Sequence, residues 1–184
     1  MIYLYIKYLD IKVNIKMATV PNDRAARAVT QWSALFPDWD LRPMELLGRL
    51  GETAAVISRD HQAPLFAKHG LQPGEFDVLA ALRRSGEPFE MTPTRLFEIT
   101  MMSSGGMTAR LDRLERRKLI KRRPSPVDRR GVLVSLSDKG LALIDRAVPE
   151  HLANQAELTA CLSDKELTTL SGLLAKLLSH ADDT

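Results

Sequence analysis

The chain has 184 residues, of which 45% are hydrophobic and 5% are aromatic, and its formal net charge is +3. This length suits one domain with a substantial core, and few aromatics beside abundant leucine and alanine favour helices over a β-sandwich. The single cysteine excludes an intrachain disulfide framework and predicts a reducing, cytoplasmic setting. The four histidines are scattered, and the sequence lacks a phosphate-binding glycine loop, a nucleophile elbow and paired carboxylates. We therefore expect no metal, no cofactor and no enzyme activity.

The first 16 residues, MIYLYIKYLDIKVNIK, differ from the rest of the chain and contain all three tyrosines. Their apolar runs are too short and too interrupted by charge to span a membrane, so we expect no membrane partner. Two interpretations stay open. The segment is either an additional strand or partner-binding arm, or an upstream start with Met17 as the true first residue, which we favour. In both cases we expect residues 1–21 to be a loosely attached extension.

Three helices are predicted between residues 23 and 84. The first begins after Pro21-Asn22-Asp23, and its apolar face carries Ala25, Val29, Trp32 and Phe36. The second runs from Pro43 to about Lys68 and ends at Gly70, with an inward face made of Leu46, Leu47, Leu50, Ala54 and Ile57. The third begins at Pro73-Gly74-Glu75 and turns four apolar residues inward, namely Phe76, Val78, Leu79 and Leu82.

A helix, a turn and a basic helix are predicted next. Thr92-Pro93-Thr94 opens the first helix, and Ser103 or Ser104 caps the second, because a serine oxygen accepts an N–H group at a helix start. The basic helix, which extends to Lys118, lays a stripe of Met107, Leu111 and Leu114 on the core. At about 100° per residue, its opposite face carries Gly105, Thr108, Ala109, Asp112, Arg113 and Arg116. Small residues come first and arginines after, which suits an N-terminal half that enters a major groove closely.

The hydrophobic period then changes from helix to strand. Residues 121–123 and 132–136 are predicted as the two arms of a hairpin, because Val132, Val134 and Leu136 alternate on one face. The loop between the arms is long and charged, so we expect it to project as a wing. From residue 103 to residue 131 the sequence holds ten Lys or Arg and three Asp or Glu, a net charge of +7. Positive charge concentrated on a winged helix-turn-helix predicts binding to double-stranded DNA.

Two further helices are predicted after the wing. Ser137-Asp138-Lys139 caps the first, and Ser163-Asp164-Lys165-Glu166 forms a capping box for the last. The last helix has leucines on two faces, at positions 167, 170, 174 and 177 on one and at 173 and 178 on the other. Such a helix needs a partner to cover it. We therefore predict a mostly α fold with a small β-hairpin wing, a winged helix-turn-helix that forms a homodimer through its N- and C-terminal helices.

The segment LERRKLIKRRPSPVDRRGVLVSLSDKG resembles the wing signature of the MarR family of winged-helix repressors, with Asp128 and Arg130 at the places of the wing's Asp-x-Arg. The resemblance covers roughly Asp23 to Ala181. It implies an obligate homodimer that binds a pseudo-palindromic operator and is released by a small ligand. The expected organisation is one domain over residues 22–181, with a DNA-binding lobe (72–136) and dimerisation helices on both sides of it (22–71 and 137–181).

DNA contacts are expected from both the basic helix and the wing. On the helix we expect them from Ser103, Ser104, Gly105, Thr108, Ala109, Arg113 and Arg116. From the wing, Arg129 or Arg130 would enter the minor groove. Asp128 would orient an arginine through a salt bridge instead of touching DNA.

Within the family, the segments FDVLAALRRSG and SSGGMTARLDRLERRKLIKR are most similar to the urate-responsive, PecS-type branch. The ligand residues of that branch fall by motif on Trp32, Asp77, Arg110 and Arg122. A planar aromatic anion such as urate or xanthine would stack on Trp32 and pair with a guanidinium. It would also repel Asp77, break its ion pair and so move the basic helix. Taken singly, the four residues have simpler interpretations: a helix-packing tryptophan, a solvated aspartate and two phosphate-binding arginines.

Two other functions stay open. A sequence-tolerant architectural DNA-binding protein would lack an effector and would bind different DNA sequences with similar affinity. A protein-interaction module would have kept the winged helix and lost DNA binding, which the segment of charge +7 disfavours. The main prediction is a ligand-responsive transcriptional repressor.

Overall fold

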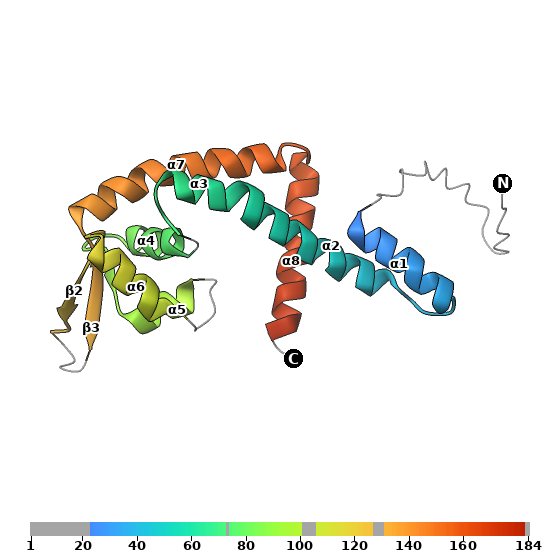
Figure 1. Cartoon of the computed structure of the whole chain (residues 1–184), viewed down its shortest axis with the longest axis horizontal. Helices are drawn as coiled ribbons and strands as arrows, with labels where there is room; N and C mark the ends of the chain where they lie inside the picture. The colour runs from blue at the N-terminus through green and yellow to red at the C-terminus, as the bar shows by residue number, and fades with distance from the viewer. Residues whose placement is uncertain (1–22, 73, 101–105, 127–130, 183–184) are drawn as a thin grey trace. The chain divides into compact units, whose positions relative to one another are not determined.

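The computed structural model describes residues 23–72, 74–100, 106–126 and 131–182. The chain divides into two compact units, residues 1–55 and residues 56–184. Figure 1 shows the helices and strands of each unit and labels most of them.

The described part of the first unit is a pair of helices, α1 (Arg24–Leu35) and α2 (Arg42–Val56), of which α2 ends at the boundary between the units. Asp23 caps α1 by accepting the Ala26 N–H at 2.8 Å, and the same carboxylate accepts the Arg49 Nε–H of α2 at 2.8 Å. Gly48 lets the two helices approach closely, because a Cβ atom there would lie 3.1 Å from the Cβ of Ala25.

The inward face predicted for α2 is wrong for a single chain. Leu46 and Leu47 are 60% and 56% exposed, and Leu50 is 37% exposed. The reason is that α2 meets α1 through the small Gly48 and the ion-paired Arg49. The leucines lie away from that contact and remain uncovered by the described residues of their unit.

The second unit begins with a π-helical segment, η1 (Ile57–Gln62), which continues α2 and passes into α3 (Ala63–Lys68). Gly70 follows at φ +67°, a conformation that glycine adopts at little cost, and its N–H donates to the Ala67 carbonyl at 2.8 Å. The long helix predicted to end at Lys68 is confirmed, with a local change of helix type.

The core of the second unit forms around α4 (Glu75–Arg84), which packs against α5 (Pro93–Ile99) and against a later helix, α7 (Asp138–Thr159). Val78, Leu79 and Leu82 are fully buried, as predicted. Burying a leucine or valine side chain contributes about 1.5–3 kcal/mol, so this stripe fixes α4 in the unit. Thr92 is the N-cap of α5, and its hydroxyl accepts the Arg95 N–H at 3.1 Å.

The basic helix, α6 (Met107–Arg116), lays its predicted stripe on this core, and Met107, Leu111 and Leu114 are all buried. The predicted serine cap is wrong, because the helix begins later. Its N-cap is Gly106 at φ +120°, without a side-chain cap, and the Gly106 carbonyl accepts the Arg110 N–H at 2.9 Å. Glycine tolerates this backbone conformation, so the turn into the helix falls there. Residues 101–105 lie outside the described residues.

The wing strands are confirmed as β2 (Ile120–Pro124) and β3 (Val132–Leu136), which pair antiparallel with Arg122 opposite Val134. A third strand, β1 (Glu90–Met91), pairs with the other edge of β3, so the sheet order is β1-β3-β2. The sequence did not predict β1, because two residues are too few to show an alternating pattern.

α7 begins in contact with the link between α6 and β2. The Ser137 hydroxyl donates to the Lys118 carbonyl at 2.7 Å, and the same oxygen caps α7 by accepting the Gly140 N–H at 3.0 Å. A Cβ atom at position 140 would lie 2.0 Å from the Leu119 carbonyl oxygen. Only glycine allows so close an approach of α7 to the link between α6 and β2.

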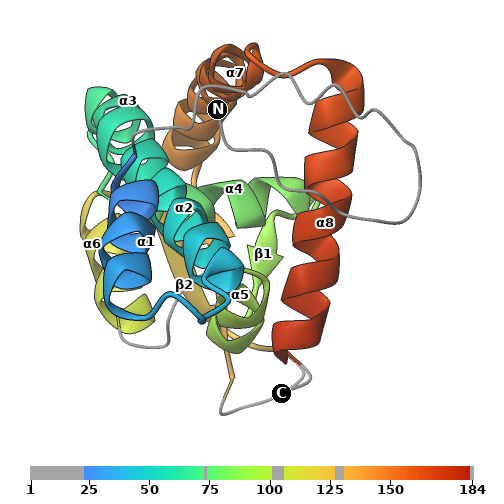
Figure 2. The same ribbon diagram turned by 90° about the vertical axis from the view of Figure 1, so that its right-hand side faces the viewer.

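The last helix, α8 (Asp164–Asp182), leaves the end of α7 through a tight turn, in a different direction from α7 (Figure 2). Its capping box is confirmed, because the Ser163 N–H donates to Glu166 Oε2 at 2.9 Å and the Glu166 N–H donates to Ser163 Oγ at 3.4 Å. Within the described chain, no residue of α8 is buried. Large exposed fractions belong to its leucines, at 42% for Leu167, 60% for Leu173 and 63% for Leu178.

Candidate DNA interface and ligand site

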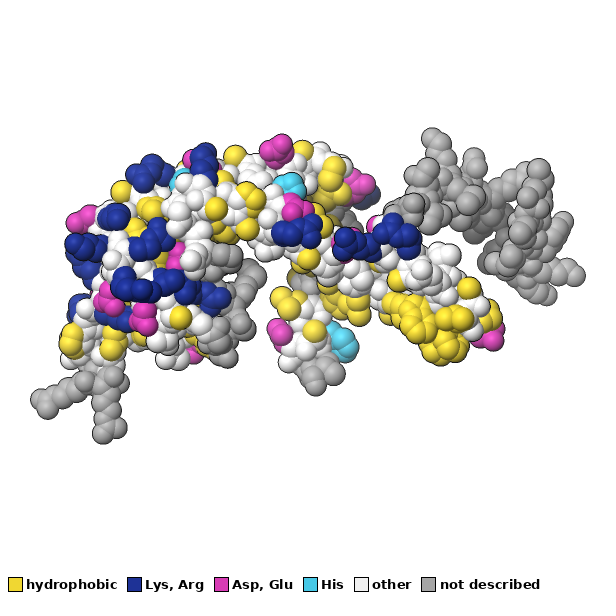
Figure 3. Space-filling model, in the orientation of Figure 1, with side chains coloured by type: hydrophobic (Ala, Val, Ile, Leu, Met, Phe, Trp, Pro, Cys, Tyr) yellow, Lys and Arg dark blue, Asp and Glu magenta, His cyan; other side chains and the backbone are white. Residues whose placement is uncertain are grey.

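α6 presents a polar, basic face on the side opposite its buried stripe. Thr108, Ala109 and Arg116 are exposed on this face, and Arg113 is half-buried. Lys and Arg side chains gather over the winged-helix part of the second unit (Figure 3). Of the other expected DNA contacts, Ser103, Ser104, Gly105, Arg129 and Arg130, together with Asp128, lie outside the described residues.

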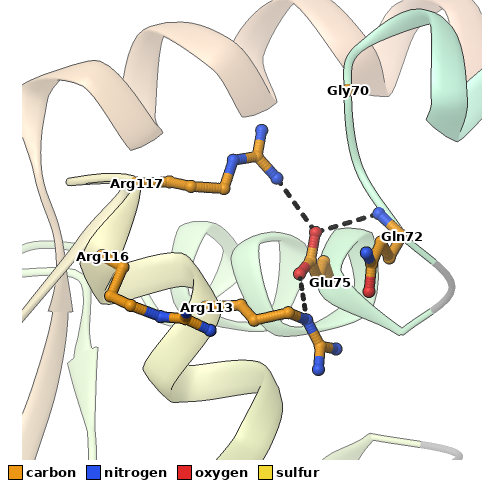
Figure 4. A pocket seen from close by; sticks show the side chains of 6 residues that line it. All are labelled: Gly70, Gln72, Glu75, Arg113, Arg116 and Arg117. Carbon is orange, nitrogen blue, oxygen red and sulfur yellow. Dashed lines mark hydrogen bonds and ion pairs between the residues drawn. The ribbon is translucent and has the colours of Figure 1, made fainter.

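A buried carboxylate holds two arginines of the basic segment. Glu75, the first residue of α4, is only 1% exposed. It accepts the Arg113 Nε–H at 3.0 Å on one oxygen and the Arg117 Nη1–H at 3.1 Å on the other (Figure 4). The Gln72 N–H donates to this second oxygen at 2.9 Å. A buried charge is costly unless it is paired and hydrogen-bonded, and here both oxygens have donors. The cluster therefore joins the start of α4 to the end of α6.

The sequence did not reveal this cluster, since Glu75 marked only a helix start. A signal was nevertheless present. Glu75, Leu79 and Leu82 are spaced i, i+4 and i+7, which puts the carboxylate on the buried stripe of α4. The cluster also bears on Arg113, because Glu75 engages its Nε and not its two terminal amino groups.

Arg122, one of the four expected ligand residues, is tied to α6. Its Nη1 lies 2.7 Å from Asp112 Oδ1 and 3.2 Å from Glu115 Oε2, and its side chain is 27% exposed. These two ion pairs connect the first wing strand, β2, to the basic helix, α6. A ligand that engages Arg122 would have to compete with two carboxylates.

Asp77 lies two residues after Glu75 on α4 and is half-buried. Burial raises the pKa of Asp77 above its ordinary value of 3.8, and the charges of His151, Arg84 and Arg110 oppose this rise. Arg110 approaches from α6, and its Nη1 atom is buried without a hydrogen-bond partner among the described residues. The charge of Arg110 thus acts on Asp77, another of the expected ligand residues, although Arg110 Nη1 donates no hydrogen bond to it.

His151 completes this cluster from α7 and was not singled out from the sequence. Its ring packs on Phe76 and Phe66, with centroid distances of 4.7 and 5.6 Å. Burial lowers the pKa of His151, opposed by the charge of Asp77, and its Nδ1 atom also lacks a partner in the described part of the chain. Among the described residues, Arg110 Nη1 is thus an unused N–H donor that an anion could engage, and His151 Nδ1 is an unused ring nitrogen.

Trp32, the fourth expected ligand residue, belongs to the first unit. It is 40% exposed and stacks on Phe36 and Trp39, with ring centroids 5.8 and 6.3 Å away. The three rings form an exposed aromatic ladder, since Phe36 and Trp39 also stack, at 4.0 Å.

Metal-binding groups and membrane-spanning helices are absent from the part of the chain that the structure describes. Its His, Cys, Asp and Glu side chains form no group of three or more that could hold a metal ion. Among the described helices, none combines the length and the apolar character needed to cross a membrane.

Comparison with known proteins gives concordant matches. A model of the MarR family matches residues 69–131. The HTH-type transcriptional regulator PecS of Dickeya dadantii is 38% identical over 152 residues, which are 83% of this chain and 91% of that protein. The crystal structure of a mutant MarR from E. coli, complexed with operator DNA, has a TM-score of 0.64 and 28% identity, and the match covers 80% of this chain and 97% of that one. The organohalide-sensing regulator RdhR-CbdbA1625, in its 2,4-dichlorophenol-bound form, shares the fold, with a TM-score of 0.68 and 23% identity over 79% of this chain and 83% of that one.

Proposed function

Because the chain belongs to the MarR family of winged-helix transcriptional regulators, we propose that it is a repressor that binds a pseudo-palindromic operator as a homodimer and is released by a small aromatic anion such as urate. One observation carries the proposal. The exposed basic face of α6 lies on the same helix as Arg110 Nη1, which has no hydrogen-bond partner among the described residues, so a ligand at Arg110 would act directly on the element that reads DNA. The cytoplasmic location predicted from the sequence belongs to this proposal.

In the proposed complex the N-terminal half of α6 enters the major groove. The small side chains of Thr108 and Ala109 let the helix approach the base edges, and Arg113 and Arg116 follow toward the end of the helix. Ser103, Ser104 and Gly105 would contact DNA at its start. Arg129 or Arg130 would reach the minor groove, with Asp128 orienting one of them.

The proposed homodimer is supported by the uncovered leucines at both ends of the described chain. Those of α8 and α2 are 37–63% exposed, far beyond the scattered apolar residues of an ordinary monomer surface. A dimer with two-fold symmetry would place its two α6 helices about one turn of DNA apart, ~34–36 Å. Deleting residues 167–184 should give a monomer in sedimentation and abolish operator binding together. A truncated protein that remains dimeric would contradict the proposed interface.

The proposed effector site comprises Trp32, Asp77, Arg110 and Arg122. An anion that pairs with Arg110 brings negative charge beside Asp77, whose ionised form is already disfavoured by burial. A ligand releases DNA only if it binds the free conformation more tightly than the DNA-bound one. The proposed basis of this difference is electrostatic, because an anion bound at Arg110 would repel the ionised Asp77 and draw the guanidinium toward itself.

The test is a footprint on the intergenic DNA beside the protein's own gene, with and without urate or xanthine. We expect a protected site with two inverted halves that is lost on adding ligand, with an affinity change of about 5- to 150-fold, the usual range of such couplings. Equal affinity for unrelated DNA, with no effect of ligand, would contradict the proposal and favour the architectural DNA-binding protein.

A further inference from the structure

The cluster around Glu75 lines an open pocket of about 390 Å³ at the end of α6. Its walls are Gly70 and Gln72 before α4, Glu75 itself, and three arginines at the end of α6, namely Arg113, Arg116 and Arg117. Figure 4 shows Arg113 and Arg117 both directed toward Glu75, with Arg116 beside them.

The pocket keeps a positive charge although it contains a buried carboxylate. Three guanidinium groups face one carboxylate, so the net charge of the lining residues is +2. Glu75 engages only the Nε of Arg113 and the Nη1 of Arg117, which leaves the remaining N–H groups of both arginines free of it. Arg116 donates to the Asp112 carbonyl of its own helix through Nε at 3.4 Å and keeps its terminal amino groups for other acceptors.

The geometry assigns Arg113, Arg116 and Arg117, positioned by Glu75, to a binding site for one phosphate of the DNA backbone. A phosphate carries negative charge and several acceptor oxygens, and guanidinium groups bind it with charge-assisted, often bidentate hydrogen bonds. Gly70 lies against the Arg117 guanidinium, since a Cβ atom there would be 3.4 Å from Arg117 Nη2. The assignment rests on the proposed DNA binding by α6, and it gives Arg113 to the backbone instead of a base edge.

Glu75 is a positioning residue in this site. It holds two flexible arginine side chains in one place before DNA arrives, which lowers the conformational entropy lost on binding. Bulk electrostatics gives the opposite sign, because removing a negative charge near DNA should strengthen binding. The sign of the Glu75→Gln effect therefore separates positioning from net charge.

The experiment measures binding of the full-length protein to two duplexes, its footprinted operator and an unrelated sequence, by fluorescence anisotropy at several salt concentrations. Each phosphate neutralised contributes about −0.9 to the slope of log K against log salt. Arg117→Ala should reduce the steepness of this slope by ~0.9 per site, or ~1.8 for a dimer, with a similar loss on both duplexes. Between roughly 50 and 200 mM salt, the advantage of the wild type should shrink about tenfold. Arg146→Ala, which removes an exposed arginine from α7, is the charge-matched control and should keep the slope.

Glu75→Gln should weaken binding to both duplexes despite the added positive charge. Tighter binding by Glu75→Gln, or a slope for Arg117→Ala equal to that of Arg146→Ala, would overturn the phosphate site. If thermal melting shows that Glu75→Gln does not fold, Arg117→Ala and Arg117→Lys decide, because the lysine keeps the charge and should keep most of the slope. A wild type that binds neither duplex would overturn the proposed function itself, whereas tight wild-type binding with an unchanged Arg117→Ala slope would remove only this site.

Discussion

Glu75 and Asp77 lie two residues apart on α4, and both interact electrostatically with arginines of the basic segment, yet their surroundings differ. Glu75 is almost fully buried and accepts from Arg113, Arg117 and the Gln72 N–H. Asp77 is half-buried, its pKa is raised by that burial, and the nearby Arg110 Nη1 has no hydrogen-bond partner among the described residues. Both oxygens of Glu75 accept hydrogen bonds, whereas Arg110 Nη1, whose arginine acts on Asp77, donates none within the described part of the chain.

The two carboxylates therefore have different proposed roles on one helix: Glu75 fixes the position of α6, and Asp77 takes part in the response to a ligand. A saturated buried ion pair is hard to disturb, because breaking it leaves an uncompensated charge. An unsaturated cluster can accept a new partner without losing existing hydrogen bonds. α6 is thus fixed to α4 near its C-terminal end by Glu75, whereas nearer its N-terminal end Arg110 Nη1 has no hydrogen-bond partner among the described residues.

Removing the saturated carboxylate should have the largest effect on stability. Glu75→Ala should lower the free energy of unfolding by about 3 kcal/mol, the lower end of the range for breaking a buried ion pair. The lower end applies because Arg113 and Arg117 are 31% and 37% exposed and can turn toward water. Urea unfolding measures this change. The control is Glu98→Ala, which breaks an exposed pair with Arg95 and should cost under ~1 kcal/mol. Equal losses in both variants would remove the contrast between buried and exposed carboxylates.

The unsaturated carboxylate should behave in the opposite way. Since burial raises the folded-state pKa of Asp77 above 3.8, the ionised group is disfavoured in the folded protein at neutral pH. Asp77→Asn should therefore raise the free energy of unfolding at pH 7, and this gain should disappear below pH 3.8, where the carboxyl group is protonated in both states. The same variant should weaken operator binding without ligand by ~1–3 kcal/mol, because it removes the charge that holds Arg110 in place. A destabilised Asp77→Asn protein would show that Asp77 is also a structural anchor.

Replacing Arg122 should change stability less and should act mainly on ligand affinity. Arg122→Ala should change stability by under ~1 kcal/mol, since the side chains of its two carboxylate partners are 49% and 41% exposed to water. Its urate affinity should fall about tenfold, corresponding to the ~1.5 kcal/mol of one charge-assisted hydrogen bond. Calorimetric titration compares it with Arg123→Ala, the neighbouring arginine that pairs with Glu90. A loss of the same size in both variants would point to a general effect of charge on the wing.

The smallest effect on DNA binding should come from Trp32. Trp32→Phe should lose the ligand-dependent fluorescence quenching and the ligand-induced release, while its operator affinity stays within ~0.5 kcal/mol of the wild type. Trp39 remains as a background signal in the same measurement. If the variant still releases DNA at the wild-type urate concentration, the effector site lies elsewhere.

Much of the fold follows from patterns within short segments. The wing strands, the Thr92 cap and the capping box of Ser163 and Glu166 are all predictable, because each depends on residues a few positions apart. The predicted start of α6 is wrong, since serine is a good cap by residue type and the positive φ of Gly106 is a property of the folded turn. The sequence does not reveal β1, because its pairing with β3 is a contact between distant segments.

The candidate site is less predictable, for the same physical reason. The family resemblance assigns Asp77 and Arg110 to one ligand site; in the structure the charge of Arg110 acts on the pKa of Asp77, and their role with a ligand stays a prediction. Glu75 and His151 escape prediction, because their importance lies in burial and in partners 38 to 42 residues away or on another helix. The leucines of α2 show the converse limit. A hydrophobic stripe predicts that something will cover it and does not say what.

Gly140 allows close packing between α7 and the link after the basic helix, and this packing bears on how that helix is oriented on DNA. Because α7 begins in contact with the Leu119 carbonyl, and the Ser137 hydroxyl donates to the Lys118 carbonyl, the link that follows α6 is packed against the first turn of α7. The axis of the basic helix is thus coupled to the axis of α7, the same helix that supplies His151. Any side chain at position 140 would clash with the Leu119 carbonyl oxygen, push α7 away from it and change the angle between the axes of α6 and α7. In the proposed homodimer, a change in that angle would alter both the tilt of each basic helix in its groove and the spacing of the two half-sites.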